Sequence, residues 1–431
     1  MATSEAIEDH AVGSESFSRR RRGWCLFVLV LIGASNYADR NIVGVLLEPI
    51  RHEFQVSDTQ LGLLSGLSFA LFYATLGIPV ALWADRGNRK TLITIALSFW
   101  SVMTALCGAA HTFWQLLAAR IGVGVGEAGA IPPAQSLLAD YYPPAERGRA
   151  LGIFSTSSTV GYALALVFGG WVAQNYGWRA AFVAVAAVGL LVAPLAHFVL
   201  REPRAERKNV AGTDASESLA GAVRSLATKR SYRLVVLGIV LYFLVAYGAL
   251  AFTVSFLIRS HGLNVAQAGA LSGAIHVVGA LFGSIGSGML SDRLARSEIG
   301  APARVAAFAL LLSAPSYWLA LITPSPVIMA IALTTGSITL HAVTPAQYAS
   351  LHTVCGSKRR AMAVAVAFFF ANLLGLGLGP LLTGVVSDRF AVDYGAADGL
   401  RYAIVCMFGM LIPTAWVMLR AARHIRADVE K

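Results

Sequence analysis

Residues 24–47 read WCLFVLVLIGASNYADRNIVGVLL and decide the class of the protein. As a helix, a stretch of this length crosses a bilayer, which takes about 20 predominantly apolar residues. It nevertheless carries Asp39 and Arg40 side by side. An ionisable group in the hydrocarbon core costs at least about 2.5–3.5 kcal/mol, so it usually marks a function or an ion pair. The stretch therefore predicts a transmembrane helix with functional charges inside it.

The whole chain has the composition of a membrane protein. Of its 431 residues, 56% are hydrophobic and 13% are charged, whereas soluble proteins carry about 25% charged residues. Long apolar runs favour an all-α polytopic membrane protein over an outer-membrane barrel, whose strands would be short alternating segments. We expect twelve transmembrane helices, at residues 24–47, 60–84, 91–110, 113–138, 149–172, 178–199, 233–258, 266–290, 303–322, 325–349, 361–386 and 398–420.

One long polar connection divides these spans into two groups of six. We expect a disordered cytoplasmic tail at 1–23, a six-helix bundle at 24–199, a cytoplasmic linker at 200–232, a second six-helix bundle at 233–420 and a cytoplasmic tail at 421–431. The basic run before the first span is not read as part of a signal peptide. The apolar run after it is too long and shows no small-residue cleavage site.

The 34 Lys and Arg residues fall mostly in alternate connections, on the side of the N-terminus. The exceptions expected on the other side are Arg51, Arg179, Arg259, Arg389 and Arg401. Basic residues are retained in the cytoplasm, so we expect both termini there and a multi-pass protein of the plasma membrane, the inner membrane in a bacterium. This topology explains the net charge of +11 without nucleic acid as a partner.

Two matches indicate an internal repeat. QLGLLSG at 60–66 recurs as QAGALSG at 267–273, and the Asp-Arg pair at 85–86 recurs at 292–293, both at an offset of 207 residues. Six helices return the chain to the same side of the membrane, so the two bundles are expected to be parallel repeats. Such a layout favours a carrier with alternating access over a channel, because channels more often use oligomeric rings.

Several motifs resemble one transporter family over the whole chain. They are ADRGNRK at 84–90, RIGVGVGEAG at 120–129, ERGRA at 146–150 and YGWRAAF at 176–182. They resemble the major facilitator superfamily, and NYADR (36–40) with GVGEAG (124–129) resembles its Spinster family. The resemblance implies the two-bundle fold and proton-linked transport of lysophospholipids or sphingoid phosphates. It also implies a cytoplasmic gate at Asp85, Arg86, Arg89, Asp292 and Arg293.

Four charged residues are expected inside the first bundle: Asp39, Arg40, Arg120 and Glu127. At about 1.5 Å rise per residue, Asp39 and Arg120 lie at similar depth, so we expect them to form a structural ion pair. Neighbouring helical residues point in different directions, so Arg40 can face the cavity and reach substrate or Glu127. The proton affinity of a carboxylate changes when its arginine partner moves. We therefore predict that Asp39 and Glu127 couple protons to transport, and that Arg40 and Glu127 bind substrate.

The second bundle has no matching charges. The repeat places Tyr247 opposite Arg40 in sequence and Thr334 opposite Glu127. The aromatic residues of the seventh span suit an amphipathic anion, whose apolar tail would lie against this bundle. His341 and Asn372 are further candidates for substrate binding, and His276 is a second histidine within a span.

Other functions are weighed against this hypothesis. A symporter for sugar acids or other small organic anions is the alternative, because such carriers share the NYxDR-like first helix. An ion channel has no filter motif to support it. An enzyme is not expected, because no nucleophile, metal-ligand or phosphate-loop motif occurs. We expect no cofactor and no metal, a monomer, and the lipid bilayer, protons and the transported anion as partners.

Overall fold

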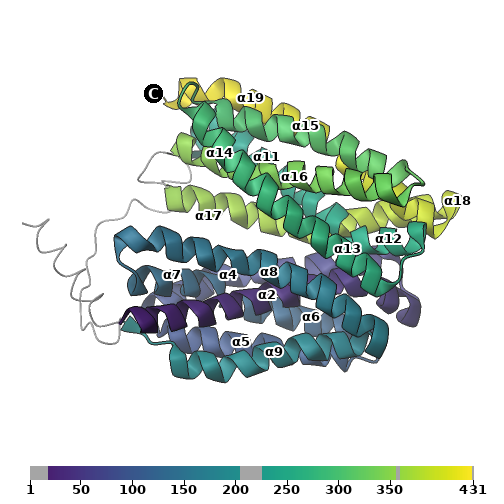
Figure 1. Ribbon diagram of the computed structural model, residues 1–431, viewed down its shortest axis with the longest axis horizontal. Coiled ribbons are helices and arrows are strands. Elements are labelled where there is room, and N and C mark those ends of the chain that lie inside the picture. The colour runs from purple at the N-terminus through teal and green to yellow at the C-terminus, as the bar shows by residue number, and fades with distance from the viewer. Residues whose placement is uncertain (1–17, 204–225, 356–359, 430–431) are drawn as a thin grey trace, which may run out of the picture. The chain divides into compact units, whose positions relative to one another are not determined.

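The computed structural model describes residues 18–203, 226–355 and 360–429, and no strand occurs within these ranges (Figure 1). The N-terminal helices are α2 (Arg19–Phe54), α3 (Asp58–Gly62), the π-helix η1 (Leu63–Leu67), α4 (Ser68–Arg86), α5 (Arg89–Gly108), α6 (Phe113–Glu127), α7 (Ile131–Tyr141), α8 (Pro144–Tyr176) and α9 (Trp178–Val199). The C-terminal helices are α11 (Arg230–Ala251), α12 (Thr253–His261), α13 (Val265–Val278), η3 (Gly279–Gly283), α14 (Ser284–Ala295), α15 (Ala301–Ile322), α16 (Pro326–Cys355), α17 (Arg360–Phe370), η4 (Ala371–Leu376), α18 (Gly377–Gly409) and α19 (Leu411–Val429).

Ten stretches of helix in the described part are long and apolar enough to cross a bilayer. The expected fourth span is divided between α6 and α7, of 15 and 11 residues, so neither helix alone is long enough. The last stretch, Met362–Asp428, contains two spans, because Gly395 turns the chain inside α18 with φ 81°. The predicted all-α architecture of twelve transmembrane helices is thus confirmed over the described ranges.

The chain divides into two compact units. The first consists of Met1–Ile50 and Leu71–Gly212, and the second of Arg51–Ala70 and Thr213–Lys431. The division after Gly212 falls within the polar connection, most of which lies outside the described residues. The segment Arg51–Ala70, which holds α3 and η1, packs with the second unit although it lies in the N-terminal half of the sequence.

In the first unit, α5 packs against α6 and α9, and α8 packs against α7 and α9. Glycine lets two of its helices touch through their backbones. A Cβ atom on Gly161 of α8 would lie 2.3 Å from the carbonyl oxygen of Ala34 in α2. Small residues allow this close packing where the lipid supplies no hydrophobic driving force between helices.

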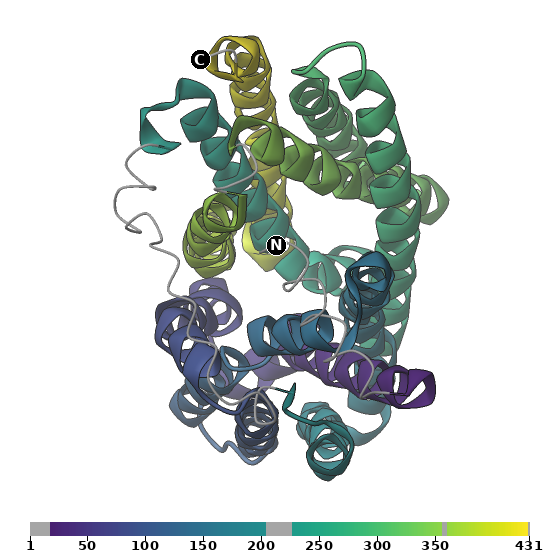
Figure 2. The ribbon, with the colours of Figure 1, turned by 90° about the vertical axis from the view of Figure 1, so that its left-hand side faces the viewer.

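In the second unit, α15 packs against α16 and α19, and α11 packs against α18 and α19. The π-helices η3 and η4 pack against α16 and α11, respectively. Single π-helical turns inside α-helices are frequent at functional sites. Figure 2 shows the helices of each unit nearly end-on.

In the two copies of the sequence repeat, the helices α3 and α13 begin with the same hydrogen-bonding arrangement. The side chain of Ser57 accepts the N–H of Gln60, and the side chain of Gln60 accepts the N–H of Ser57. Asn264 and Gln267 form the same reciprocal pair at the start of α13. Such a capping box satisfies two backbone donors that the helix itself leaves unpaired, and it recurs here at the offset of the sequence repeat.

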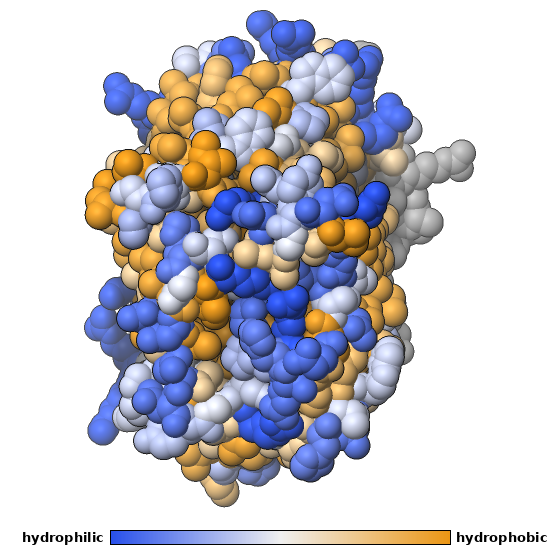
Figure 3. Space-filling model, turned by 90° about the vertical axis from the view of Figure 1, so that its right-hand side faces the viewer, coloured by the Kyte–Doolittle hydropathy of each residue, from blue (hydrophilic) through white to orange (hydrophobic). Residues whose placement is uncertain are grey.

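The surface has the polarity expected for a membrane protein. Large apolar side chains are exposed along the helices, for example Leu191 at 75% and Phe198 at 80%. Figure 3 looks onto the end of the helices at which α12 ends and α13 begins, and hydrophilic residues gather there. The large apolar side chains that are exposed along the helices suit contact with lipid rather than with water.

Candidate functional site

A buried ion pair lies at the centre of the candidate site in the first unit. Arg40 of α2 donates from Nε and Nη2 to the same oxygen, Oε2 of Glu127, at 3.3 and 3.1 Å. The Glu127 side chain is fully buried and that of Arg40 is 10% exposed. The second carboxylate oxygen, Oε1, is buried and accepts no hydrogen bond from the described residues. One half of the carboxylate therefore remains available for a proton or a ligand donor.

Glu127 occupies the last residue of a broken helix. The chain turns over Ala128–Ala130, and α7 starts again with Pro132 and Pro133 in its first turn. Proline suits a first turn, because the amide hydrogen it lacks has no partner there. Broken membrane helices commonly carry the ion and substrate sites of transporters, because irregular backbone is tolerated only where it is shielded from lipid.

Glycine determines how closely α6 approaches α5 beside this pair. A Cβ atom on Gly126 would lie 2.8 Å from the Cβ atom of Trp100 and 3.0 Å from its backbone nitrogen. The two helices therefore pack too closely for a larger residue. Gly126 therefore permits a close approach of α6 to α5 directly beside Glu127.

Two aromatic rings lie close to the Arg40 guanidinium. Its Cζ lies 4.6 Å from the ring centroid of Tyr73 in α4 and 5.5 Å from that of Tyr37 in α2. A cation within about 6 Å of a ring face is attracted by the ring quadrupole. Two rings thus stabilise the charge of Arg40 without neutralising it.

Asp39 points away from Arg40, as neighbouring helical residues must. Its Oδ2 accepts the indole N–H of Trp100 at 3.1 Å, and its side chain is fully buried. Arg120, the expected ion-pair partner of Asp39, donates to two main-chain carbonyl oxygens, to that of Asp39 at 3.0 Å and to that of Arg40 at 3.3 Å. Arg120 thereby fixes the backbone that presents both residues.

The predicted substrate residues of the second unit lie on three different helices. Tyr247 stacks on Phe243 at 5.4 Å between centroids, and Phe243 also contacts Phe368, which stacks on Tyr348. These four rings form an aromatic cluster on α11, α16 and α17. The polar candidates are used locally: Thr334 donates to the carbonyl oxygen of Ala330, and Asn372 donates to that of Phe368.

The two histidines of the second unit meet. The rings of His276 and His341 are 4.7 Å apart between centroids and nearly perpendicular, and His341 Nδ1 lies 2.8 Å from the carbonyl oxygen of Ser337. Within the described ranges, no group of three His, Cys, Asp or Glu residues is placed to hold a metal ion.

The expected gate residues have different surroundings. Arg89 is buried and binds Glu202 at 2.5 Å, Asp140 at 2.7 Å and the hydroxyl of Ser136 at 2.8 Å. Asp292 and Arg293 are exposed near the end of α14. The side chains of Asp85 and Arg86 lie outside the described residues.

Several neighbours of the predicted residues were missed from the sequence. They are Tyr37, Tyr73 and Trp100 around the charges, and Glu202 beside Arg89. Aromatic residues are ordinary in a membrane span and gave no signal. Glu202 is the first acidic residue after the sixth span, and its pairing with Arg89 depends on tertiary structure.

Comparison with known proteins identifies the family to which the chain is similar. Residues 29–303 match the family model of the Major Facilitator Superfamily. An MFS-type efflux pump of Mycolicibacterium smegmatis is 31% identical over 417 residues, which are 95% of each chain. The hexuronate transporter of Bacillus subtilis is 25% identical over 395 residues, which are 88% of this chain and 91% of that protein.

A solved structure gives a further match. A bacterial homologue of the human lysosomal transporter Spinster, in an inward-facing and unoccupied conformation, is 32% identical and has a TM-score of 0.86. The match covers 96% of this chain and 99% of that one. The resemblance to bacterial Spinster homologues is therefore confirmed, and these relatives are transporters rather than enzymes. The chain belongs to the Major Facilitator Superfamily.

Proposed function

We propose that the protein is a proton-coupled secondary transporter that works by alternating access and carries an amphipathic anion, such as a lysophospholipid or a sphingoid phosphate. The observation that carries this proposal is the buried Arg40–Glu127 pair at a break in a membrane helix. Ionisable residues in such a position normally serve substrate or ion movement.

The geometry supports an exchange of partners at Arg40. A phosphate or carboxylate can accept two parallel hydrogen bonds from a guanidinium, whereas Glu127 uses only one oxygen. An anionic headgroup would therefore compete with Glu127 for Arg40. Glu127 would then be left buried without its partner and would take up a proton, because a lone charge in this environment is costly. Release of the headgroup would return Arg40 to Glu127 and expel the proton.

Asp39 is the second candidate for proton coupling. Its Oδ1 is buried and accepts no hydrogen bond in the described part of the chain, while Oδ2 is held by Trp100. Arg120 would act as a structural partner by holding the backbone of Asp39 and Arg40 in place. The protonation of Asp39 would then follow movements of α2 against α5 and α6.

The aromatic cluster of the second unit supports an amphipathic substrate. Its members, Phe243, Tyr247, Tyr348 and Phe368, supply apolar surface without formal charge. Thr334, His341 and Asn372 remain candidates for polar contacts. We further propose a monomer in the plasma membrane with both termini in the cytoplasm, on the basis of the distribution of Lys and Arg.

A symporter for sugar acids is the second candidate. The likeness to the hexuronate transporter of Bacillus subtilis favours it. A small sugar acid offers a carboxylate for Arg40, but its hydroxyl groups would need further polar partners.

Transport in proteoliposomes tests both candidates. Purified protein would be assayed for uptake driven by a pH gradient, with a lysophospholipid and a hexuronate as competing substrates. We expect the lysophospholipid to compete and the hexuronate not to. We also expect the pH-driven component to be lost in Asp39→Asn or Glu127→Gln and kept in Glu146→Gln, a matched control at an exposed carboxylate. Undiminished pH-driven uptake in both Asp39→Asn and Glu127→Gln would contradict proton coupling.

A further inference from the structure

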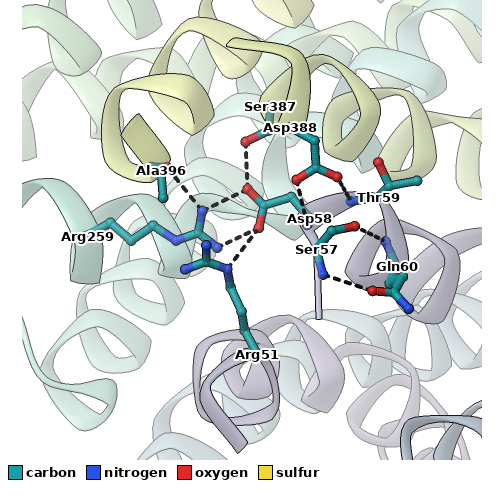
Figure 4. A network of polar contacts seen from close by, with 9 residues as sticks. All are labelled: Arg51, Ser57, Asp58, Thr59, Gln60, Arg259, Ser387, Asp388 and Ala396. Atoms are coloured by element: carbon teal, nitrogen blue, oxygen red, sulfur yellow. Dashed lines mark hydrogen bonds and ion pairs between the residues drawn. The ribbon is translucent and has the colours of Figure 1, made fainter. Parts of the chain in front are cut away.

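The network at the start of α3 shows how the second unit satisfies a buried carboxylate (Figure 4). Arg259 of α12 donates to both oxygens of Asp58, at 2.7 and 2.8 Å. Ser387 of α18 donates its hydroxyl to Asp58 Oδ2 at 2.6 Å. Asp388 accepts the backbone N–H groups of Asp58 and Thr59, at 2.9 and 2.8 Å. Every oxygen of these two carboxylates is therefore in a hydrogen bond.

The helices that carry this network also pack tightly. A Cβ atom on Gly62 of α3 would lie 2.3 Å from the carbonyl oxygen of Pro380 in α18. One on Gly384 of α18 would lie 2.1 Å from the carbonyl oxygen of Asp58. Small residues at such positions let two membrane helices touch through their backbones. The polar groups around Asp58 thus join helices to one another and are not a ligand site.

The buried polar groups beside Asp39 in the first unit are different. Ser35 and Asp39 of α2 and Ser101 and Thr104 of α5 are at most 4% exposed. Within the described ranges, Ser35 Oγ, Asp39 Oδ1, Ser101 Oγ and Thr104 Oγ1 take part in no hydrogen bond, and the amide group of Asn36 is unpaired as well. Buried polar groups nearly always have a partner, so a cluster of exceptions indicates bound water or an ion.

The four oxygen atoms belong to neighbouring side chains. Ser35 and Asp39 are four residues apart on α2, and Ser101 and Thr104 are three apart on α5, so each pair shares a helix face. The Asp39 carboxylate adjoins the hydroxyl groups of Ser35 and Thr104. A Cβ atom on Gly189 of α9 would lie 2.1 Å from Ser101 Oγ and 3.2 Å from Ser35 Oγ. The four groups therefore form a ring, and Gly189 leaves room beside it.

This arrangement suits a hard cation. Such ions take several oxygen ligands at once, and oxygen atoms that face a common ion do not hydrogen-bond one another. A proton needs only one acceptor, which Oδ1 of Asp39 would supply alone. The other carboxylate oxygen, Oδ2, is already bound by Trp100 at 3.1 Å. The three hydroxyl groups beside the carboxylate are therefore explained by an ion larger than a proton.

The charge of the ring favours a monovalent ion. The ring contains one carboxylate, Asp39, whose backbone carbonyl oxygen binds Arg120 at 3.0 Å, while Arg40 is paired with Glu127. A sodium ion brings the same single positive charge as the proton proposed for Asp39, so the two arginines oppose both ions equally. A divalent ion would leave a second charge uncompensated in a buried site, which is costly.

We propose that Ser35, Asp39, Ser101 and Thr104 form a sodium site, at which a sodium ion takes the place of the proton. Water completes the coordination shell, and the amide oxygen of Asn36 lies on the same helix within one turn of Asp39. The inference rests on the proposed function only where that treats Asp39 as an ion-coupling residue. The binding of sodium itself requires neither a substrate nor transport.

Equilibrium dialysis of the purified protein in detergent against radioactive sodium tests the site. Choline chloride would keep the ionic strength constant. We expect saturable binding that unlabelled sodium displaces and choline does not. Asp39→Asn should abolish it. Thr104→Val, which keeps the shape of the side chain, should weaken it about tenfold or more, because even groups that only orient metal ligands are worth about 10- to 100-fold in affinity.

Two further variants separate the site from general effects of mutation. Gly189→Ala should weaken sodium binding without removing a ligand, because its methyl group would press on the Ser101 hydroxyl. The matched control is Thr156→Val, at an exposed threonine of α8 that donates to the carbonyl oxygen of Ile153, and it should bind sodium like the parent. If Asp39→Asn does not fold, Thr104→Val and Ser101→Ala carry the test.

The possible outcomes distinguish this inference from the proposed function. A parent protein without saturable sodium binding, or an unchanged affinity in every folded site variant, would overturn the sodium site, and the hydroxyl groups would then surround water only. Uptake driven by a pH gradient in a protein that binds no sodium would leave the proposed function intact. Sodium binding by a protein whose uptake ignores the pH gradient would instead contradict only proton coupling.

Discussion

Arg40–Glu127 and Arg259–Asp58 are both arginine–carboxylate pairs with little exposure, yet they are built differently. Arg259 engages both oxygens of Asp58, and Ser387 adds a third short contact. Arg40 engages one oxygen of Glu127 and is stabilised by two aromatic rings. The difference indicates that a fully satisfied pair suits holding a conformation, while a half-satisfied pair suits exchanging partners.

Asp58→Asn should give the largest effect, on stability. It leaves Arg259 buried without its carboxylate, which costs about 3–5 kcal/mol when one member of a buried pair is removed. Thermal unfolding in detergent would measure the loss, with Asp393→Asn as the control for an exposed pair worth about 0–1 kcal/mol. Equal unfolding temperatures for the two variants would remove the distinction between the pairs.

Glu127→Gln should act on transport more than on stability. Glutamine cannot give up a proton, so uptake driven by a pH gradient should fall about 100-fold, which corresponds to about 2.7 kcal/mol. Exchange of labelled for unlabelled substrate without a gradient should persist, because Arg40 can still bind the anion. A parallel loss of both activities would mean that Glu127 serves binding or folding and not proton coupling.

Gly384→Ala tests the close packing of α18 against α3 without removing a charged group. Its Cβ atom would lie 2.1 Å from the carbonyl oxygen of Asp58, and forced overpacking costs about 1–3 kcal/mol. Gly288→Ala in α14 is the matched control, since no atom lies within 4 Å of its Cβ position. Unfolding temperature should fall in the first variant and hold or rise in the second. An equal change in unfolding temperature in both variants would mean that the structure around Gly384 adapts to a methyl group at little cost.

Tyr73→Leu should give the smallest effect. It removes the nearer ring beside Arg40, an interaction worth about 0.5–2 kcal/mol, so the apparent affinity for the anion should weaken about 2- to 30-fold. Tyr73→Phe keeps the ring face and should keep most of the affinity. If the phenylalanine variant loses as much as the leucine variant, the ring face is not what Arg40 needs.

The fold could be read from the sequence because apolar runs and the placement of Lys and Arg report on lipid directly. The charges at Asp39, Arg40 and Glu127 were also visible, since a charge within a span is costly. The structure brings Arg40 and Glu127 into contact, while their roles in transport stay predictions.

The network around Asp58 gave no such signal. Asp58, Arg259 and Asp388 lie near the ends of spans, where charges are ordinary, and their partners are 137 to 330 residues apart in sequence. The hydrogen bonds from Arg120 to the backbone of α2 could not be predicted either, because depth places a residue beside Asp39 but does not say which main-chain atoms it meets. Such choices depend on packing at a few atoms.

The packing of residues 51–70 also bears on how the protein is made. During synthesis, Gly62, Gly66 and the Asp58 carboxylate emerge long before α12 and α18 exist. Until the second half of the chain is made, the glycine face of this segment would lack its packing partner, and the Asp58 carboxylate would lack Arg259. Both would be exposed to lipid or to chaperones. A gene cut within the connection between α9 and α11 should consequently give an N-terminal fragment that accumulates only when the C-terminal fragment is co-expressed.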